Sequence, residues 1–301
     1  MDEDTILLRV ARRAARGMAR GVVLGMGDDC AIFSPRAGED LVFTSDMLVE
    51  DVHFRRATHT PRDVGHKILA RGLSDIAAVG AEPRFCLLSL ALPEATPRPW
   101  IDGIFAGVLR LATSAKVRLA GGDLGTAPVI TADVMVCGSV PHGQALRRDG
   151  ARAGDIIYVS GQLGASALGL AGTRGEALRR HLRPSPRLAL GRYLRRLGAT
   201  ACIDLSDGLS SDLARVCRAS GVSARITRPP IFRGASEEQA LDGGEDYELL
   251  FTAPPAIRVP PAFGKIPLTA IGTMLKGRPG RVLLEGKPLP ALGYDHFRSK
   301  N

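Results

Sequence analysis

The sequence lacks the features by which most nucleic-acid-binding proteins can be recognised. Aromatic residues make up only 5% of it and there is a single tryptophan, so it offers no platform for stacking bases. Its 40 lysine and arginine residues, mostly arginine, give a formal net charge of +9, but they are dispersed along the chain instead of forming a recognition motif. We therefore expect no nucleic-acid partner.

Paired cysteines and long apolar runs are missing as well. The five cysteines are widely separated, without a C-x-x-C pair or a spacing typical of zinc ligands, so we expect buried reduced thiols. The longest apolar runs, residues 85–92 and 134–140, are far too short to cross a bilayer. Residues 6–14 have apolar side chains at helical spacing, which favours an amphipathic helix over a signal or transit peptide. Together these features predict a cytoplasmic protein without a membrane partner.

The common nucleotide-binding motifs are also absent. The chain contains no G-x-x-x-x-G-K-[ST] loop, no G-x-G-x-x-G turn between a strand and a helix, and no protein-kinase signature. A nucleotide site in this protein must therefore hold its phosphates by other means.

What the sequence does contain is a series of short acidic motifs. Each lies among glycines or serines beside an apolar run, where we expect a strand or helix to end in a turn. Carboxylates that converge repel one another unless cations bind between them, and a ligand set made only of oxygen favours Mg²⁺. In a chain of net positive charge, such a site indicates a substrate that carries phosphate. The motifs are GMGDDCA (Asp28, Asp29), FTSDML (Asp46), GLSDIAAVG (Asp75), AGGDLGT (Asp123), IDLSDGL (Asp204, Asp207) and LDGGEDYELL (Glu245, Asp246).

The apolar pattern predicts two units, each of ordinary domain size. In residues 1–143, strands mixed with two long helices suggest an α+β layer. A polar, glycine-rich and basic stretch marks the boundary, and residues 144–301 form the second unit. The expected strands are 28–33, 41–46, 85–92, 117–120, 130–140, 156–160, 201–205, 248–252 and 268–273. The expected helices are 61–79, with Thr60 as N-cap, 99–115, 165–171, one launched by Pro184 and Pro186, and 209–220.

The motifs of the first unit have structural as well as functional interpretations. Asp28 and Asp29 suit an ordinary turn, and because adjacent strand residues point to opposite faces, only one could easily reach a given metal. Asp75 lies in a helix-like segment among residues expected to be buried, and an unpaired buried charge is costly, so it needs either an arginine or a metal as partner. Asp46, predicted at a strand end, suits a hard cation, whereas a lone His53 is more often a cap or surface residue than a ligand.

The later motifs allow the same two interpretations. The two glycines before Asp123 would let the backbone approach an anion. Asp204 and Asp207 lie three residues apart, ahead of a predicted helix, and helix N-termini attract phosphates. Ser206 or Asp207 could equally serve as a simple N-cap. Glu245, which precedes a buried strand, is a candidate contact to a substrate hydroxyl or ring.

Taken in order, these motifs strongly resemble those of the thiamine-monophosphate kinases, a family within the superfamily of aminoimidazole ribonucleotide and selenophosphate synthetases. The resemblance runs nearly end to end, from GMGDDCAIF to GYDHF, and includes RDGARAGDIIYVSGQLGASALGL and HLRPSPR. It implies a two-domain α/β fold of the aminoimidazole ribonucleotide synthetase (PurM-like) type. It also implies an N-terminal sheet that pairs with its twin in a homodimer, and an ATP site between the domains.

The resemblance further implies roles for individual residues. Asp207 and Arg148 match catalytic positions. The positions that match ATP contacts are Gly122, Asp123, Arg148 and Ser206, and those that match contacts to thiamine monophosphate are His53, Glu245 and Tyr294. The positions that match magnesium ligands are Asp29, Thr44, Ser45, Asp46, Asp75, Asp123, Asp204 and Asp207. Three departures from the family pattern, at Leu124-Gly125, Arg71-Gly72 and Asp51, could change hydrogen bonds around the ligands and hence metal affinity.

The implied reaction is direct in-line phosphoryl transfer from ATP to thiamine monophosphate, which gives thiamine diphosphate and ADP. The acceptor oxygen is already anionic at pH 7, so Mg²⁺ ions and Arg148 would act chiefly by neutralising phosphate charge. Two other interpretations stay open: a sister enzyme that uses ATP to activate an oxygen, and an inactive nucleotide-binding homologue. Selenophosphate synthetases carry a reactive cysteine or selenocysteine near the N-terminus, whereas the first cysteine here is Cys30, and the complete carboxylate set argues against a lapsed site.

Overall fold

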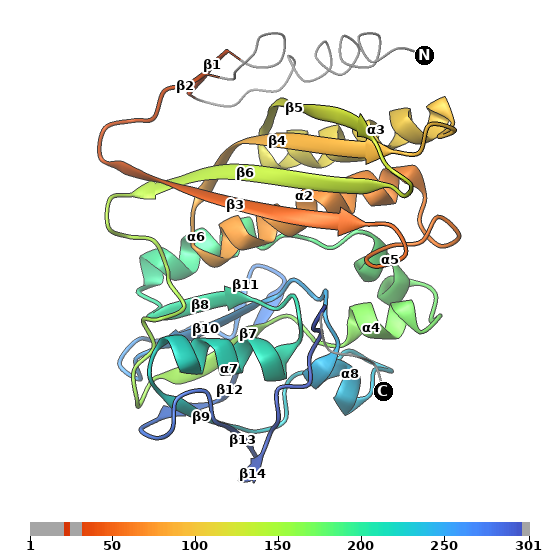
Figure 1. The fold of residues 1–301 in the computed structure, drawn as a ribbon. Helices are drawn as coiled ribbons and strands as arrows, with labels where there is room; N and C mark the ends of the chain where they lie inside the picture. The colour runs from red at the N-terminus through yellow and green to blue at the C-terminus, as the bar shows by residue number, and fades with distance from the viewer. Residues whose placement is uncertain (1–20, 25–31, 297–301) are drawn as a thin grey trace. The chain divides into compact units, whose positions relative to one another are not determined.

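The structure, a computed structural model, describes residues 21–24 and 32–296 (Figure 1). The chain divides into two compact units, one formed by residues up to Ile76 with Ala81–Gln144 and the other by Ala77–Gly80 with Ala145–Asn301. No helix in the described ranges is long and apolar enough to cross a bilayer. The helix expected over residues 6–14 and most of the strand expected over 28–33 lie outside the described residues.

The first unit is built on a four-stranded mixed sheet with the strand order β3-β6-β4-β5. Strands β3 (Glu39–Val49), β6 (Thr131–Pro141) and β4 (Glu82–Leu92) pair antiparallel, and β5 (Arg118–Thr126) runs parallel to β4. Helices α2 (Pro61–Ala78) and α3 (Arg98–Ala115) cover one face of this sheet (Figure 1). Two short strands, β1 (Val22–Leu24) and β2 (Ile32–Phe33), pair with each other.

Helix α2 begins as the sequence predicts. The backbone N–H of Asp63 donates to the hydroxyl oxygen of Thr60 at 3.3 Å, and the carboxylate of Asp63 accepts the backbone N–H of Thr60 at 3.0 Å. This reciprocal arrangement satisfies backbone donors that the first helical turn leaves unpaired. The predicted N-cap at Thr60 is therefore confirmed, and it fixes where α2 starts beneath the sheet.

The side chains of β3 alternate between the two faces of the sheet. Phe43 and Met47 are 62% and 53% exposed on the face that the helices leave open, whereas Leu48 on the other face is 1% exposed. Part of the open face is covered, because Phe33 packs on Phe85 with ring centroids 5.2 Å apart. The remainder of that face presents an unusual amount of apolar surface to solvent.

The second unit contains a larger sheet with helices on both faces. Its path runs β14-β13-β9-β12-β7-β10-β8, and β11 pairs with β12. Side chains of α7 (Leu209–Ala219) pack into a core on one face, and side chains of α6 (Leu188–Leu197) pack into a core on the other. The strands are β7 (Ile156–Ser160), β8 (Ala201–Asp204), β9 (Ser223–Ile226), β10 (Leu249–Ala253), β11 (Ala262–Phe263), β12 (Ile266–Leu275), β13 (Val282–Leu284) and β14 (Lys287–Pro288), and the remaining helices are α4 (Ala165–Leu170), α5 (Glu176–Leu182) and α8 (Glu237–Asp242).

Most expected elements of the chain are present, but two expectations about the motifs are wrong. Asp46 lies inside the 11-residue strand β3 and not at its end. The AGGD segment, expected as a turn after a strand, is itself part of β5, which continues to Thr126. Both errors arise because polar and glycine residues interrupt the apolar pattern, while pairing with neighbouring strands still holds the backbone extended. The sequence pattern does not predict the short elements β1, β9, β11, β13, β14, α5 and α8.

The cysteines behave as expected where the structure describes them. Cys86, Cys137, Cys202 and Cys217 are all buried free thiols. Burial raises the pKa of the Cys86 thiol to about 12, so this residue stays protonated and unreactive at neutral pH.

The position of Gly122 in β5 yields a first prediction. Its φ is +150°, and a Cβ there would lie 1.9 Å from the carbonyl oxygen of Leu88 on β4. We expect Gly122→Ala to destabilise the protein by about 1–3 kcal/mol, because the sheet would have to shift to make room. The matched control is Gly125→Ala in the same strand, where a Cβ would meet nothing within 4 Å. The free energy of unfolding of both variants is measured by urea denaturation without nucleotide. Equal values would show that the sheet itself does not require glycine at position 122.

Candidate functional site

Four side chains of the first unit form a cluster between β3 and α2, on the helix-covered face of the sheet. The hydroxyl of Thr44 donates to Oδ2 of Asp75 at 2.5 Å. Asp46 lies two residues further along β3, and its carboxylate oxygen Oδ1 accepts hydrogen bonds from Nε and Nη2 of Arg71 at 3.0 and 2.7 Å. We refer to Thr44, Asp46, Arg71 and Asp75 as the β3–α2 cluster. It brings together three of the residues that the family resemblance assigns to magnesium.

A second group of polar side chains lies on the open face of the same sheet. The hydroxyl of Ser45 lies 2.7 and 2.9 Å from the two carboxylate oxygens of Asp133 on β6. Asp133 is paired in register with Ser89 on β4, and Ser89 is paired with Asp123 on β5. Because residues paired in register point to the same face, Asp133, Ser89 and Asp123 form one polar row across β6, β4 and β5. Ser45 on the edge strand β3 joins this row through its hydrogen bond to Asp133.

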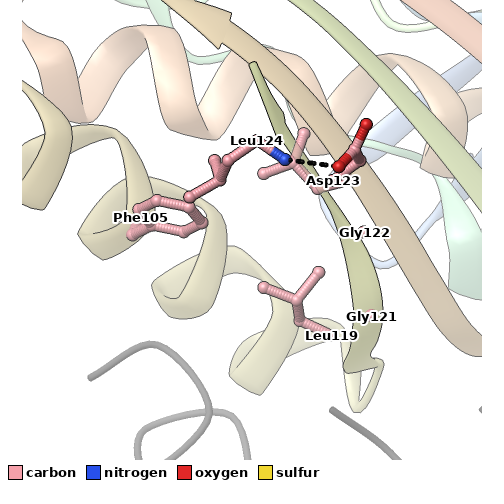
Figure 2. Close-up of a pocket in the computed structure, with 7 residues that line it drawn as sticks. Phe105, Leu119, Gly121, Gly122, Asp123 and Leu124 are labelled. Carbon is pink, nitrogen blue, oxygen red and sulfur yellow. Dashed lines mark hydrogen bonds between the residues drawn. The ribbon is translucent and has the colours of Figure 1, made fainter. Parts of the chain in front are cut away.

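Asp123 turns its carboxylate away from the helices. Figure 2 shows Leu124 and Leu119 directed toward Phe105 of α3, whereas the Asp123 carboxylate points to the opposite side of β5 and accepts the backbone N–H of Leu124 at 3.0 Å. This orientation follows from the alternation of side chains along the strand. Asp123 is therefore not part of the β3–α2 cluster, although both belong to the predicted metal set.

The structure thus divides the predicted metal-binding residues of the first unit between two faces. Among the described residues, no group of three or more His, Cys, Asp or Glu side chains is close enough to hold a metal ion. The donors that do meet are carboxylate and hydroxyl oxygens, which are the ligands that Mg²⁺ prefers. The chemistry of the donor set therefore fits a hard cation, while Asp29, which would add a further carboxylate, lies outside the described residues.

His53 lies in the turn that follows β3. Its Nδ1 accepts the backbone N–H of Val49 at 3.0 Å, and its carbonyl oxygen accepts Nζ of the fully buried Lys67 at 3.1 Å. Asp51 in this turn has a φ of +64°, a conformation that aspartate tolerates better than most residues. The cap-like contact weighed for His53 from the sequence is present, and Lys67 anchors the turn to α2.

In the second unit, backbone hydrogen bonds bring the remaining predicted residues together. The backbone N–H of Glu245 donates to the carbonyl of Ser206 at 2.8 Å, and the N–H of Tyr294 donates to the carbonyl of Asp207 at 2.9 Å. Asp204, which is 2% exposed, is paired in register with Leu249 at the end of β8. The segments around 204–207, 245 and 294 therefore lie side by side.

Asp207 forms an ion pair within this group. Nη1 of Arg215 lies 2.5 Å from Oδ2 of Asp207 and 2.5 Å from Oδ1 of Asp212. Burial, together with the charge of Asp207, raises the pKa of Asp212 to about 6, although Arg215 opposes this shift. The simple N-cap considered for Ser206 or Asp207 is wrong: α7 is preceded by Gly208 without a side-chain cap, and Asp212 instead accepts the backbone N–H groups of Asp207 and Gly208 at 3.1 and 3.2 Å.

Glu245 is held by side chains that the sequence did not single out. Its Oε2 lies 3.4 Å from Nδ1 of His181, and the same nitrogen lies 3.0 Å from the hydroxyl of Ser166. The neighbouring Asp246 accepts the backbone N–H groups of Gly164 and Ser166 at 2.6 and 3.1 Å. Burial raises the pKa of Asp246 to about 7, against the effect of these two donors. Glu245 is therefore fixed in a partly buried position, with a φ of +65°.

Arg148 lies apart from these hydrogen bonds. Its side chain is exposed, and its carbonyl oxygen accepts the hydroxyl of Ser220 at 2.8 Å. The structure thus anchors the backbone of Arg148 and leaves its guanidinium at the surface, where an anion could reach it.

Sequence reasoning missed several residues that touch predicted site residues, among them Asp133, Arg215 and His181. Asp133 could have been found, because it is a lone carboxylate in the alternating pattern of its strand. Arg215 could have been found as the i+3 neighbour of Asp212 on one helix face. His181 gave no local signal, since only the folding of the chain places it beside Glu245.

Comparison with known proteins identifies the family. The model of the AIR synthase related protein N-terminal domain matches residues 27–140, and that of the C-terminal domain matches residues 152–284. The thiamine-monophosphate kinase of Salmonella typhimurium is 38% identical to this chain over 92% of each sequence. The crystal structure of thiamine-monophosphate kinase from Stenotrophomonas maltophilia matches with a TM-score of 0.83 at 38% identity, covering 95% of this chain and 98% of that one.

A second solved structure is that of AaThiL complexed with AMPPCP and TMP. It matches with a TM-score of 0.80 at 29% identity over 99% of both chains. The two-unit architecture, the order of the motifs and these matches agree. The chain belongs to the AIR synthase-related (PurM-like) superfamily and, within it, to the thiamine-monophosphate kinase family.

Proposed function

We propose that this protein transfers the γ-phosphoryl group of ATP to thiamine monophosphate, producing thiamine diphosphate and ADP. The observation that carries the proposal is the match over 99% of both chains to a structure complexed with AMPPCP, an ATP analogue, and TMP. Two relatives that are named thiamine-monophosphate kinase and are matched over most of their length support the proposal. The phosphate-directed chemistry inferred from the acidic motifs is consistent with this reaction.

The residues of the first unit would provide the metal-binding side of the reaction. We propose that Asp46 and Asp75 of the β3–α2 cluster, with Thr44, and the open-face residues Ser45 and Asp123 bind Mg²⁺, together with Asp29, Asp204 and Asp207. Bound Mg²⁺ would neutralise phosphate charge and favour transfer. Because Thr44 and Ser45 point to opposite faces of β3, they would contact different ions.

A second set of residues would hold the nucleotide and the acceptor. Gly122 of the first unit and Ser206 would contact ATP, and the exposed guanidinium of Arg148 suits a phosphate oxygen, which it can bind with two parallel N–H groups. Glu245, fixed beside His181, would orient thiamine monophosphate, with His53 and Tyr294. No strong general base is required, because the attacking phosphate oxygen is already anionic at neutral pH. Residues 1–143 and 144–301 would be the two domains of this enzyme. The cytoplasmic location stays a prediction.

We also propose that the open face of the first sheet pairs with a second copy of this chain. Phe43 and Met47 are exposed there, and the partly exposed Leu87 and Met135 lie on the same face. Exposed apolar side chains gathered on one sheet face are a common mark of an interface between subunits. The family resemblance supplies the occupant, a homodimer.

The first test of the proposal is turnover. Purified protein with Mg²⁺ and ATP should form thiamine diphosphate from thiamine monophosphate but not from free thiamine, measured by chromatography of the products. A folded protein that yields no diphosphate from the monophosphate would refute the assignment.

Replacing Asp75 tests the metal-binding role. Asp75→Asn keeps an oxygen that can accept the Thr44 hydroxyl but removes the charge, and we expect turnover to fall about 100-fold or more at low Mg²⁺. Asp102→Asn, a surface change on α3 where Arg98 lies 3.7 Å away, is the matched control and should keep its activity. Unchanged activity of Asp75→Asn at low Mg²⁺ would show that this carboxylate binds no metal.

The dimer is tested with a charged substitution on the open face. Met47→Glu places a carboxylate among apolar side chains and should convert the dimer to monomer in sedimentation velocity at micromolar protein. Leu170→Glu, which changes a side chain that is 68% exposed elsewhere in the chain, should leave the association state unaltered. A dimer that survives Met47→Glu would assign the interface to a different surface.

A further inference from the structure

Arg71 is a cation placed among residues that are proposed to bind a cation. Its guanidinium donates twice to one carboxylate oxygen of Asp46, at 3.0 and 2.7 Å. The two side chains are only 14% and 20% exposed, so solvent and salt screen this pair less than an ordinary surface ion pair. The guanidinium therefore occupies an oxygen that a metal ion would otherwise use.

The position of Arg71 follows from the spacing of the two elements that meet. Thr44 and Asp46 are two residues apart on β3, which separates them by about 6.6 Å. Arg71 and Asp75 are four residues apart on α2, which separates them by about 6 Å along the helix. The near-equal spacings let both pairs, Thr44 with Asp75 and Asp46 with Arg71, form at once.

The packing of α2 against the sheet holds this arrangement in place. A Cβ on Gly72, the residue after Arg71, would lie 2.7 Å from Cγ2 of Val136 on β6. The helix thus lies close to the strands at this point, and the Arg71 backbone has little freedom to retreat. The contact is built into the fold and does not depend on a mobile surface side chain.

The charges of the cluster show what Arg71 does. Asp46 and Asp75 carry two negative charges, and Arg71 offsets one of them. Without the guanidinium the partly buried carboxylate of Asp46 would lose the positive charge that lies beside it in the metal-free protein, which is unfavourable. With it, the cluster is stable before a metal binds, but a metal ion must then share or displace the guanidinium.

We propose that Arg71 is a resident counter-ion of Asp46, which stabilises the metal-free protein and lowers its affinity for Mg²⁺. The inference rests on the proposed function only in taking Mg²⁺ as the ion that the β3–α2 cluster binds. Its consequence is that this chain needs more Mg²⁺ than one with a neutral residue at position 71.

The test compares Arg71→Met with the unaltered protein. Titration calorimetry with Mg²⁺ in the presence of AMPPCP should show Mg²⁺ bound at least about tenfold more tightly by the variant, as expected from removing a positive charge within a few ångströms of the ion. Thermal unfolding in EDTA should show a lower midpoint for the variant, and added Mg²⁺ should raise that midpoint more than it does in the unaltered protein.

Arg84→Met is the matched control. Nη2 of Arg84 lies 2.9 Å from Oε1 of Glu39 on the same sheet, and the Arg84 side chain is 7% exposed. Its loss should lower the unfolding midpoint in EDTA without changing the affinity for Mg²⁺. Arg71→Lys, which keeps the charge, should retain an affinity close to that of the unaltered protein. In an Asp46→Asn background, the effect of Arg71→Met on Mg²⁺ affinity should largely disappear.

Weaker or unchanged Mg²⁺ binding by Arg71→Met would overturn the proposal. Weaker binding would mean that Arg71 orients Asp46 for the metal. Unchanged binding would mean that Arg71 and Mg²⁺ do not compete for Asp46. Absence of any response to Mg²⁺ in all forms would overturn it as well. If Arg71→Met fails to fold, Arg71→Gln, which keeps a donor without charge, replaces it. These measurements need no turnover. If the protein forms no thiamine diphosphate, the proposed function is refuted, but the Mg²⁺ affinities of Arg71→Met and the unaltered protein can still be compared.

Discussion

The alternation of side chains along β3 is the constraint on which the first unit depends. Successive residues of an extended strand point to opposite faces, so Thr44 and Asp46 meet α2 while Ser45 and Met47 reach the open face. A single run of sequence thereby supplies two separate oxygen clusters and one apolar surface. The β3–α2 cluster and the exposed apolar side chains of Phe43 and Met47 can occupy the same strand because they lie on different faces of it.

Arginine side chains compensate the carboxylates of both units. Arg71 is bonded to Asp46 in the first, and Arg215 lies 2.5 Å from both Asp207 and Asp212 in the second. Part of the net charge of +9 lies in these ion pairs. At these points guanidinium groups lie directly against the acidic side chains of both units.

The second unit positions its residues mainly through the backbone. Carbonyl groups of Ser206 and Asp207 accept N–H groups from Glu245 and Tyr294, so three segments that are distant in sequence converge through main-chain hydrogen bonds. The buried His181 also lies beside Glu245, with its Nδ1 3.4 Å from Oε2.

The sequence by itself determined the element types, the candidate residues and the family, because apolar periodicity and motif order are local properties of the chain. It did not determine which candidates meet. Placing Asp46 at a strand end and AGGD in a turn failed because strand pairing, a long-range interaction, keeps polar and glycine residues extended. The same pairing put Asp123 and Thr44 on opposite faces, and the packing of α2 on β3 joined Arg71 to Asp46. Partners of this kind are chosen by the register of strands and the approach of helices, and only the tertiary structure fixes those.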